Sequence, residues 1–120
     1  MRPAKLAATF GAGRALFGIA LLAAPAEITR AWVGRDDAAA LVLARCLGGR
    51  DVVVGAGAAM AAVRHRDPAP WLVGGAVADV VDGIVTLAAG ERIPRSGRLG
   101  TVALVGPSAA VGAWLARAVR

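Results

Sequence analysis

The chain has 120 residues, of which 58% are hydrophobic, and its mean hydropathy is +0.63. This composition excludes a disordered chain and a collagen, and a single cysteine excludes an intramolecular disulfide scaffold. A water-soluble globule is disfavoured, because a chain of this length cannot bury so much apolar surface. The net charge of +6 would also suit a nucleic-acid-binding protein, but only 4% of the residues are aromatic. We therefore expect a membrane protein that has the lipid bilayer as its partner and binds no nucleic acid.

Four apolar runs follow one another along the chain, each close to the roughly 20 residues that a helix needs to cross a bilayer. They cover residues 6–24, 38–63, 71–89 and 99–119. Lipid admits only helices or closed barrels, and these long runs lack the alternation of a barrel strand. The sequence thus predicts an all-α fold, a four-transmembrane-helix bundle that forms a single membrane domain over residues 1–120.

Each of the last three runs is preceded by a side chain that can cap the free N–H groups of a first helical turn. These are Asp36 and Asp37 before the second run, Asp67 with Pro68 at the first helical position before the third, and Ser96 before the fourth. The segment over residues 27–33 is too short to span a bilayer. We expect it to form one or two turns at the membrane interface, with its apolar side chains turned inward.

The positive charges specify the orientation only weakly. With the N-terminus inside, six basic residues fall on the cytoplasmic side and five on the outer side. Arg2 and Lys5, which begin the first run, favour a protein of the inner (plasma) membrane with both termini in the cytoplasm. A cleaved signal peptide over residues 1–26 is an open alternative, because this segment ends in the small-residue site Ala24-Pro25-Ala26.

Six ionisable residues lie well inside the apolar runs. Each costs about 2.5–3.5 kcal/mol at a helix centre on insertion scales, so they cannot all face lipid. Three are arginines and three are aspartates, which makes the set neutral, and antiparallel neighbours would bring them to similar depths. We expect them to form one connected, buried network. Its candidate members are Arg14, Arg45, Arg50, Asp51, Asp79 and Asp82.

The helical period places some of these residues on a shared face. Asp79 and Asp82 are about 60° apart around their helix, and Gly75 and Gly83 flank Asp79 on the same face. Small residues let a partner helix come close, so this face is expected to pack against a neighbour. The three charges of the second run point in three directions, so that helix is expected to contact neighbours on several sides.

Two interpretations of the charges follow. In the first, arginine–aspartate pairs specify how the helices pack, since the planar guanidinium pairs well with a carboxylate. In the second, an aspartate pair beside arginine marks a proton or ion pathway, as expected for a small proton- or ion-coupled transporter. Dry and fully paired carboxylates would favour structure, whereas a cavity that reaches Asp79 or Asp82 would favour transport. The structural or accessory role, with a homo-oligomer or a membrane-protein partner as open alternatives, is our main hypothesis.

An enzymatic role has one weak motif in its favour. Asp79-x-x-Asp82-Gly83 matches the opening of the metal-binding motif of CDP-alcohol phosphotransferases, whose carboxylates hold a divalent metal ion. No aspartate follows Asp82, so half of the ligands of that motif are missing. We therefore expect no catalytic, cofactor-binding or metal-binding residue, no cofactor and no enzymatic activity. Cys46 is expected to be a buried small hydrophobe.

Most of the chain resembles a group of uncharacterised small four-helix membrane proteins that are common in high-GC bacteria. The matching residues are Gly13-Arg14 with Gly18, then Pro25, Trp32-x-Gly34, Arg45-x-x-Gly48-Gly49-Arg50-Asp51-x-x-x-Gly55 and Asp79-x-x-Asp82. The resemblance covers about residues 10–90. It implies a four-helix membrane fold and no known activity, and a DoxX-like protein is the near alternative.

Overall fold

A computed structural model describes residues 2–120, and within this range the chain forms helices and no strand. The elements are α1 (Pro3–Ala23), α2 (Pro25–Val33), α3 (Ala38–Val63), α4 (Ala69–Ala88), the single 3-10 turn η1 (Gly90–Arg92) and α5 (Arg95–Ala118). The predicted all-α bundle is confirmed. In the described range four helices, namely α1, α3, α4 and α5, are long and apolar enough to cross a membrane.

Three of the four long helices begin earlier than the apolar runs that predict them. Only the run over 38–63 coincides with its helix, α3, whereas α1 begins at residue 3, α4 at residue 69 and α5 at residue 95. The reason is that backbone hydrogen bonding starts ahead of the first apolar side chain, and a proline in the first turn supports the start of both α1 and α4.

The predicted caps are confirmed in part. The Asp37 carboxylate accepts a hydrogen bond from the Ala40 N–H at 3.0 Å and caps α3 as expected. Asp67 accepts from the Ala69 N–H at 2.8 Å, but Pro68 is the N-cap residue of α4 and not its first helical residue. The prediction for Ser96 is wrong, because Pro94 holds the N-cap position of α5 and Ser96 already lies within the first turn.

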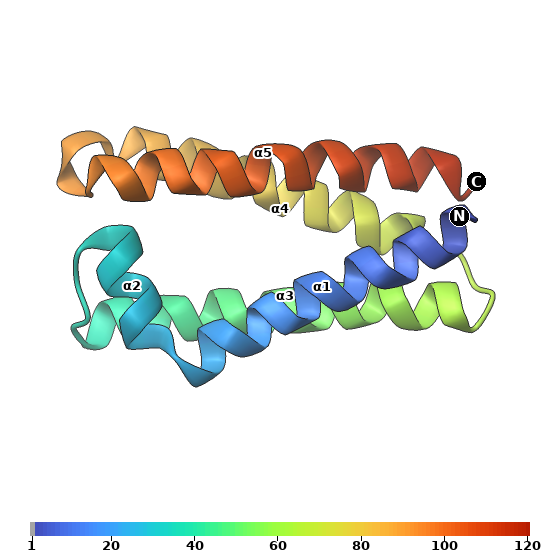
Figure 1. Cartoon of the computed structure of the whole chain (residues 1–120), viewed down its shortest axis with the longest axis horizontal. Coiled ribbons are helices and arrows are strands. Elements are labelled where there is room, and N and C mark those ends of the chain that lie inside the picture. The colour runs from blue at the N-terminus through green and yellow to red at the C-terminus, as the bar shows by residue number, and fades with distance from the viewer. Residues whose placement is uncertain (1) are drawn as a thin grey trace.

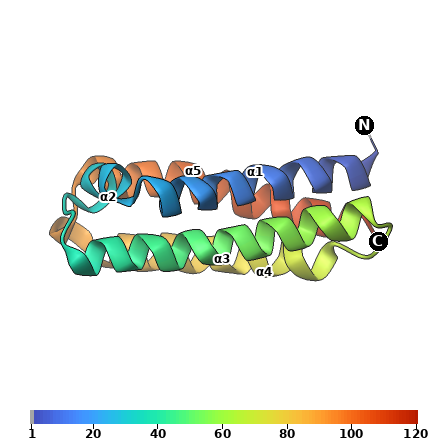
Figure 2. The same ribbon diagram turned by 90° about the horizontal axis from the view of Figure 1, so that it is seen from below.

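The long helices run antiparallel to their chain neighbours and pack as two pairs. α1 packs most extensively against α3 and α4 against α5, while the contacts between the two pairs are fewer. Figures 1 and 2 together show a square arrangement in which α1 and α4 lie on opposite corners, and both ends of the described chain lie at one end of the bundle. The bundle is 42 Å long, close to the roughly 40–45 Å of a bilayer with its headgroups.

Small residues hold α1 and α3 together. A Cβ atom added to Gly11 would lie 2.6 Å from the carbonyl oxygen of Gly55, and one added to Gly18 would lie 2.5 Å from that of Gly48. The two glycines of each helix are seven residues apart, or about two turns, so they recur on one face. This close approach of backbones is typical of helix pairs in membranes.

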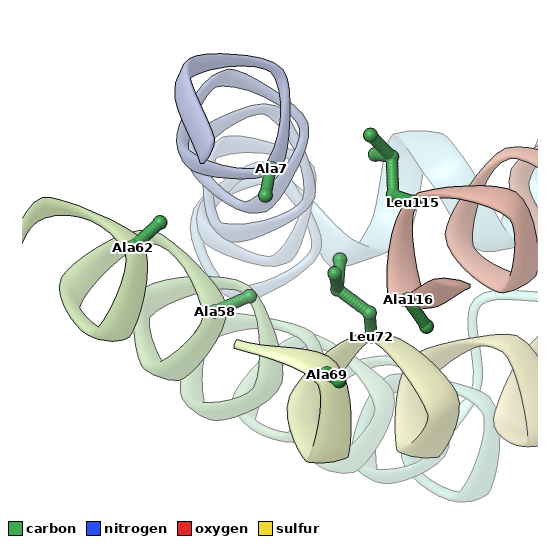
Figure 3. Packing of buried hydrophobic residues seen from close by; sticks show 7 residues of the cluster. All are labelled: Ala7, Ala58, Ala62, Ala69, Leu72, Leu115 and Ala116. Atoms are coloured by element: carbon green, nitrogen blue, oxygen red, sulfur yellow. The ribbon is translucent and has the colours of Figure 1, made fainter. Parts of the chain in front are cut away.

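The interior is small and the surface is large. The buried apolar residues are mostly alanines, whereas leucines, isoleucines and valines such as Leu16, Val42 and Ile84 are more than half exposed. One apolar cluster fills the end of the bundle that carries the α3–α4 loop, and Figure 3 shows its residues coming from α1, α3, α4 and α5, with Leu72 near the middle. Its members are Ala7, Ala58, Ala62, Ala69, Leu72, Leu115 and Ala116.

α2 closes part of the other end. It is a nine-residue helix that starts at Pro25, and it contacts both α3 and α5 (Figure 1). Gly97 of α5 lies against the backbone of Trp32, where a Cβ atom would collide with the Trp32 carbonyl oxygen. Thr29 is fully buried. α2 therefore spaces the α1–α3 pair from α5 at this end.

Candidate functional site

Arg14 occupies the centre of the bundle. It lies midway along α1, and its guanidinium donates through Nη1 and Nη2 to both carboxylate oxygens of Asp79 at 3.0 and 2.8 Å. Nη2 also donates to Asp51 Oδ1 at 3.0 Å. The side chain of Arg14 is only 9% exposed, and those of the two aspartates are 7% exposed. Arg14 thus reaches across the diagonal of the bundle and joins α1 to both α3 and α4.

Gly75 makes room for this arginine. A Cβ atom at Gly75, one turn before Asp79 on α4, would lie 3.1 Å from Arg14 Nη1. Gly83, one turn after Asp79, faces Val105 of α5 in the same way, at 3.2 Å from its Cγ2. The predicted packing face of α4 is therefore present, and side chains of α1 and α5 pack against it.

Arg50 extends the ion pairs toward the α2 end. Its Nη1 and Nη2 donate to the two oxygens of Asp82 at 3.0 and 2.7 Å, and its Nε and Nη2 donate to Asp51 Oδ1 at 3.2 and 3.1 Å. This pair is more open than the first, because the side chains of Arg50 and Asp82 are 30% and 23% exposed. The charges alternate along one chain of contacts, which we call the ion-pair chain. It runs Asp79–Arg14–Asp51–Arg50–Asp82.

Arg45 does not belong to the ion-pair chain, and the expectation that it would join is wrong. Its side chain is exposed, and it makes no ion pair with any residue in the range 2–120. The cause is its position on α3, roughly 140° around the helix from Arg50, which points it away from the other helices. Its long stem suits snorkelling toward the headgroups.

Because Arg45 lies outside the ion-pair chain, the net charge of the buried set differs from the predicted one. The ion-pair chain holds two guanidinium groups and three carboxylates, so it carries a net charge of −1 when every group is ionised. A neutral set of six becomes a negative set of five. This imbalance could not be seen from the sequence, because it depends on which face of α3 turns inward.

A partly open cavity of about 520 Å³ lies beside the exposed end of the ion-pair chain. It occupies the space that α2 opens between α3 and α5. Arg50, Asp51 and Asp82 line it, and Glu27 adds a further carboxylate. Its other walls are mostly apolar: Phe17, Leu21, Ile28, Ala31, Trp32, Leu47, Leu104 and Val105, with Ser96, Gly97, Gly100 and Thr101 from the first turns of α5.

Sequence reasoning missed this cavity. Glu27 and Gly100 belong to no motif, and the place of Trp32 on the cavity wall depends on how far α5 stands from α3. Two signals in the sequence could have pointed to it. One is the helix start at Pro25, and the other is the pair Gly97 and Gly100, which leaves two positions without a side chain on the side of α5 that lines the cavity.

The position of Cys46 on α3 corrects one further expectation. Cys46 is exposed, so the prediction that it is buried is wrong, because its face of α3 lies next to that of Arg45 and points outward. Asp79 and Asp82 pair with different arginines, and in residues 2–120 no three His, Cys, Asp or Glu side chains gather into a group that could hold a metal ion.

No family model, no curated protein and no solved structure matches this chain. The geometry of the ion-pair chain and of the cavity beside it therefore carries the functional argument.

Proposed function

We propose that the chain is a multi-pass integral membrane protein with a structural or accessory role and no enzymatic activity. Two features support a bilayer as its solvent: the long apolar helices, and a surface of large aliphatic side chains over an interior of alanine and glycine. We place it in the inner (plasma) membrane, with both termini in the cytoplasm. We also propose that the chain belongs to the group of small four-helix membrane proteins that its residues 10–90 resemble.

One observation carries the structural role. The α1–α3 and α4–α5 pairs share few direct contacts, and Arg14 bonds to carboxylates of both pairs at the centre of the bundle. In lipid, there is no hydrophobic force to press the two pairs together, so polar contacts and close packing decide which helices associate. Arg14 then acts as the clasp that fixes one arrangement of the two pairs.

The test replaces Arg14 alone and together with its partner. Arg14→Met leaves Asp51 and Asp79 without their shared cation, and removal of one partner from a buried ion pair costs about 3–5 kcal/mol. We expect this variant to unfold at a lower SDS mole fraction than the wild type in mixed micelles. Arg14→Met with Asp79→Leu removes both charges of the bidentate pair and is expected to recover a substantial part of the loss.

Arg45→Met is the matched control, because Arg45 is an exposed arginine of the same bundle without an ion pair in the described range. It is expected to leave the unfolding midpoint within about 0.5 kcal/mol of the wild type. Equal unfolding midpoints for Arg14→Met and Arg45→Met would show that Arg14 does not hold the two helix pairs together.

A small proton- or ion-coupled transporter is the second candidate, and the cavity that reaches Asp82 favours it. The two ends of the ion-pair chain favour different interpretations of the charges. Asp79 is nearly dry and fully paired, as a structural role requires, while Asp82 is partly exposed to the cavity, as a binding role requires. A transporter must bind its substrate. If the cavity binds nothing, only the structural role remains.

A further inference from the structure

We propose that the cavity between α2, α3 and α5 is a binding site for a lipophilic organic monocation, a molecule with one positive charge on an apolar body. The inference rests on the proposed membrane location and gives the second candidate function a class of ligand. It is carried by two observations: the size and lining of the cavity, and the charge of the ion pairs that border it.

The cavity fits a small organic molecule. Its volume of about 520 Å³ lies within the roughly 300–1,000 Å³ of ligand pockets. Apolar side chains such as Phe17, Leu21 and Leu104 form most of the wall, which suits an apolar body. Trp32 lines the same space, and an aromatic ring face attracts cations.

The charge at the inner end selects the sign of the ligand. The ion-pair chain carries one more carboxylate than guanidinium, and of its carboxylates Asp82 is the most exposed. Glu27 lies on the cavity wall as well. An anion would meet an excess of carboxylates there, and a neutral ligand would leave the excess charge without a partner in a medium of low dielectric constant. A monocation beside Asp82 brings the ion-pair chain to neutrality.

An apolar body distinguishes this ligand from a metal ion. In residues 2–120 no three acidic, His or Cys side chains form a group suited to a metal ion, and both oxygens of Asp82 already accept from Arg50. A bulky cation needs no such ligand set. It interacts with the excess charge at longer range and obtains its remaining affinity from apolar contact.

The test uses tetraphenylphosphonium and tetraphenylborate, two ions of nearly the same shape and of opposite charge. The full chain is reconstituted in phosphatidylcholine nanodiscs, and binding of radiolabelled tetraphenylphosphonium is measured by equilibrium dialysis against empty nanodiscs. We expect saturable binding of tetraphenylphosphonium, and we expect tetraphenylborate, measured alone, to bind no more than it does to empty nanodiscs. Binding no greater than that of empty nanodiscs, or a site that takes both ions equally, would overturn the proposal.

Two variants locate the site. Asp82→Asn is expected to weaken the binding of tetraphenylphosphonium at least tenfold. Gly100→Leu fills the cavity without a change of charge, because Gly100 lines the cavity and an added Cβ would meet nothing within 4 Å. Gly106→Leu is its matched control on α5, since it has the same open surroundings and does not line the cavity.

We expect Gly100→Leu to lower affinity at least tenfold and Gly106→Leu to leave it unchanged. If Asp82→Asn fails to fold, the glycine pair still decides the result, and equal binding by the two glycine variants contradicts the proposal. Failure here is distinguishable from failure of the clasp, because the Arg14 experiment measures resistance to SDS and needs no ligand.

Discussion

At the scale of single residues, Asp37 provides a pH-dependent part of the stability of α3. The hydrogen bond from the Ala40 N–H, followed by that from Arg35, lowers the pKa of this exposed carboxyl below its ordinary value of 3.8. A lowered folded-state pKa means that the contribution is fully present above the ordinary pKa and is lost as the pH falls through the folded-state value. Asp37 therefore stabilises the helix at neutral pH and ceases to do so in acid.

We predict that Asp37→Asn reduces the acid sensitivity of the protein. Asparagine is also a good N-cap, so the variant keeps a side-chain acceptor for the Ala40 N–H but cannot titrate. The measurement is the unfolding midpoint in SDS between about pH 6 and about pH 3, followed by circular dichroism. Asp36→Asn, on the neighbouring exposed aspartate, serves as the control. An unchanged pH profile for Asp37→Asn would exclude this cap as its source.

The buried charges show how far single residues can be predicted from sequence. A cost of about 2.5–3.5 kcal/mol for each charge in lipid is enough to predict that most of the six candidates turn inward. The same argument fails for Arg45, because an arginine can carry its charge along a flexible stem toward the headgroups. Which arginine pairs and which one snorkels depends on the rotation of α3 about its axis, and the apolar runs are too uniform to define that rotation.

At the scale of the helix, the contact between α1 and α3 depends on glycines placed two turns apart. Gly11 and Gly18 face Gly55 and Gly48, and the backbones are too close for any Cβ atom to fit between them. The adjacent glycines are different, since added Cβ atoms at Gly13 and Gly49 would meet nothing within 4 Å. The two classes of glycine look alike in the sequence, and only the packing separates them.

We predict that Gly18→Leu forces α1 away from α3, whereas Gly13→Leu leaves the pair in place. Overpacking of a tight contact costs about 1–3 kcal/mol or more, while replacement of an exposed helical glycine relieves up to about 1 kcal/mol of unfavourable propensity. The two variants should therefore shift the SDS unfolding midpoint in opposite directions. A loss of stability at Gly13 equal to that at Gly18 would mean that the glycines do not mediate this contact.

The elements themselves are largely predictable, and their interfaces are not. Lipid requires every backbone group in a span to be paired within its helix, so a long apolar run predicts a helix whatever its neighbours do. That constraint explains why α3 coincides with its run over 38–63. It says nothing of α2, whose nine residues have too few apolar side chains to define a span and take their place from contacts with α3 and α5.

At the scale of the whole molecule, the bundle is divided along its length into three zones. An apolar cluster around Leu72 fills one end, the Arg14 ion pairs occupy the middle, and the cavity beside Asp82 opens at the end that carries α2. The Arg14 ion pairs in the middle are nearly dry, whereas the end that carries α2 is partly hollow. A ligand in this cavity would lie beside Asp82 and would leave the bidentate pair between Arg14 and Asp79 in place, because neither of these two residues lines the cavity.

The direction of these zones across the membrane follows from orientation, for which the charges offer a bias of only six basic residues to five. We predict that the α3–α4 loop faces the cytoplasm and the α4–α5 turn faces outward. In a Cys46→Ser background, His65→Cys and Glu91→Cys place single thiols at exposed positions on these two segments without the loss of an arginine. A membrane-impermeant maleimide should label Glu91→Cys in intact cells and His65→Cys only after the membrane is opened.

Cys46 itself gives the control for membrane depth. Its thiol is exposed on α3, about 12 Å from the start of the helix, and would react readily if water surrounded the bundle. In a bilayer the same thiol faces hydrocarbon, where a polar reagent does not enter. It should therefore resist labelling in both intact and opened membranes and react once SDS unfolds the protein. Labelling of Cys46 in opened membranes would contradict the assignment of α3 as a membrane span. If intact cells label His65→Cys and not Glu91→Cys, the orientation is inverted and the cavity lies on the cytoplasmic side.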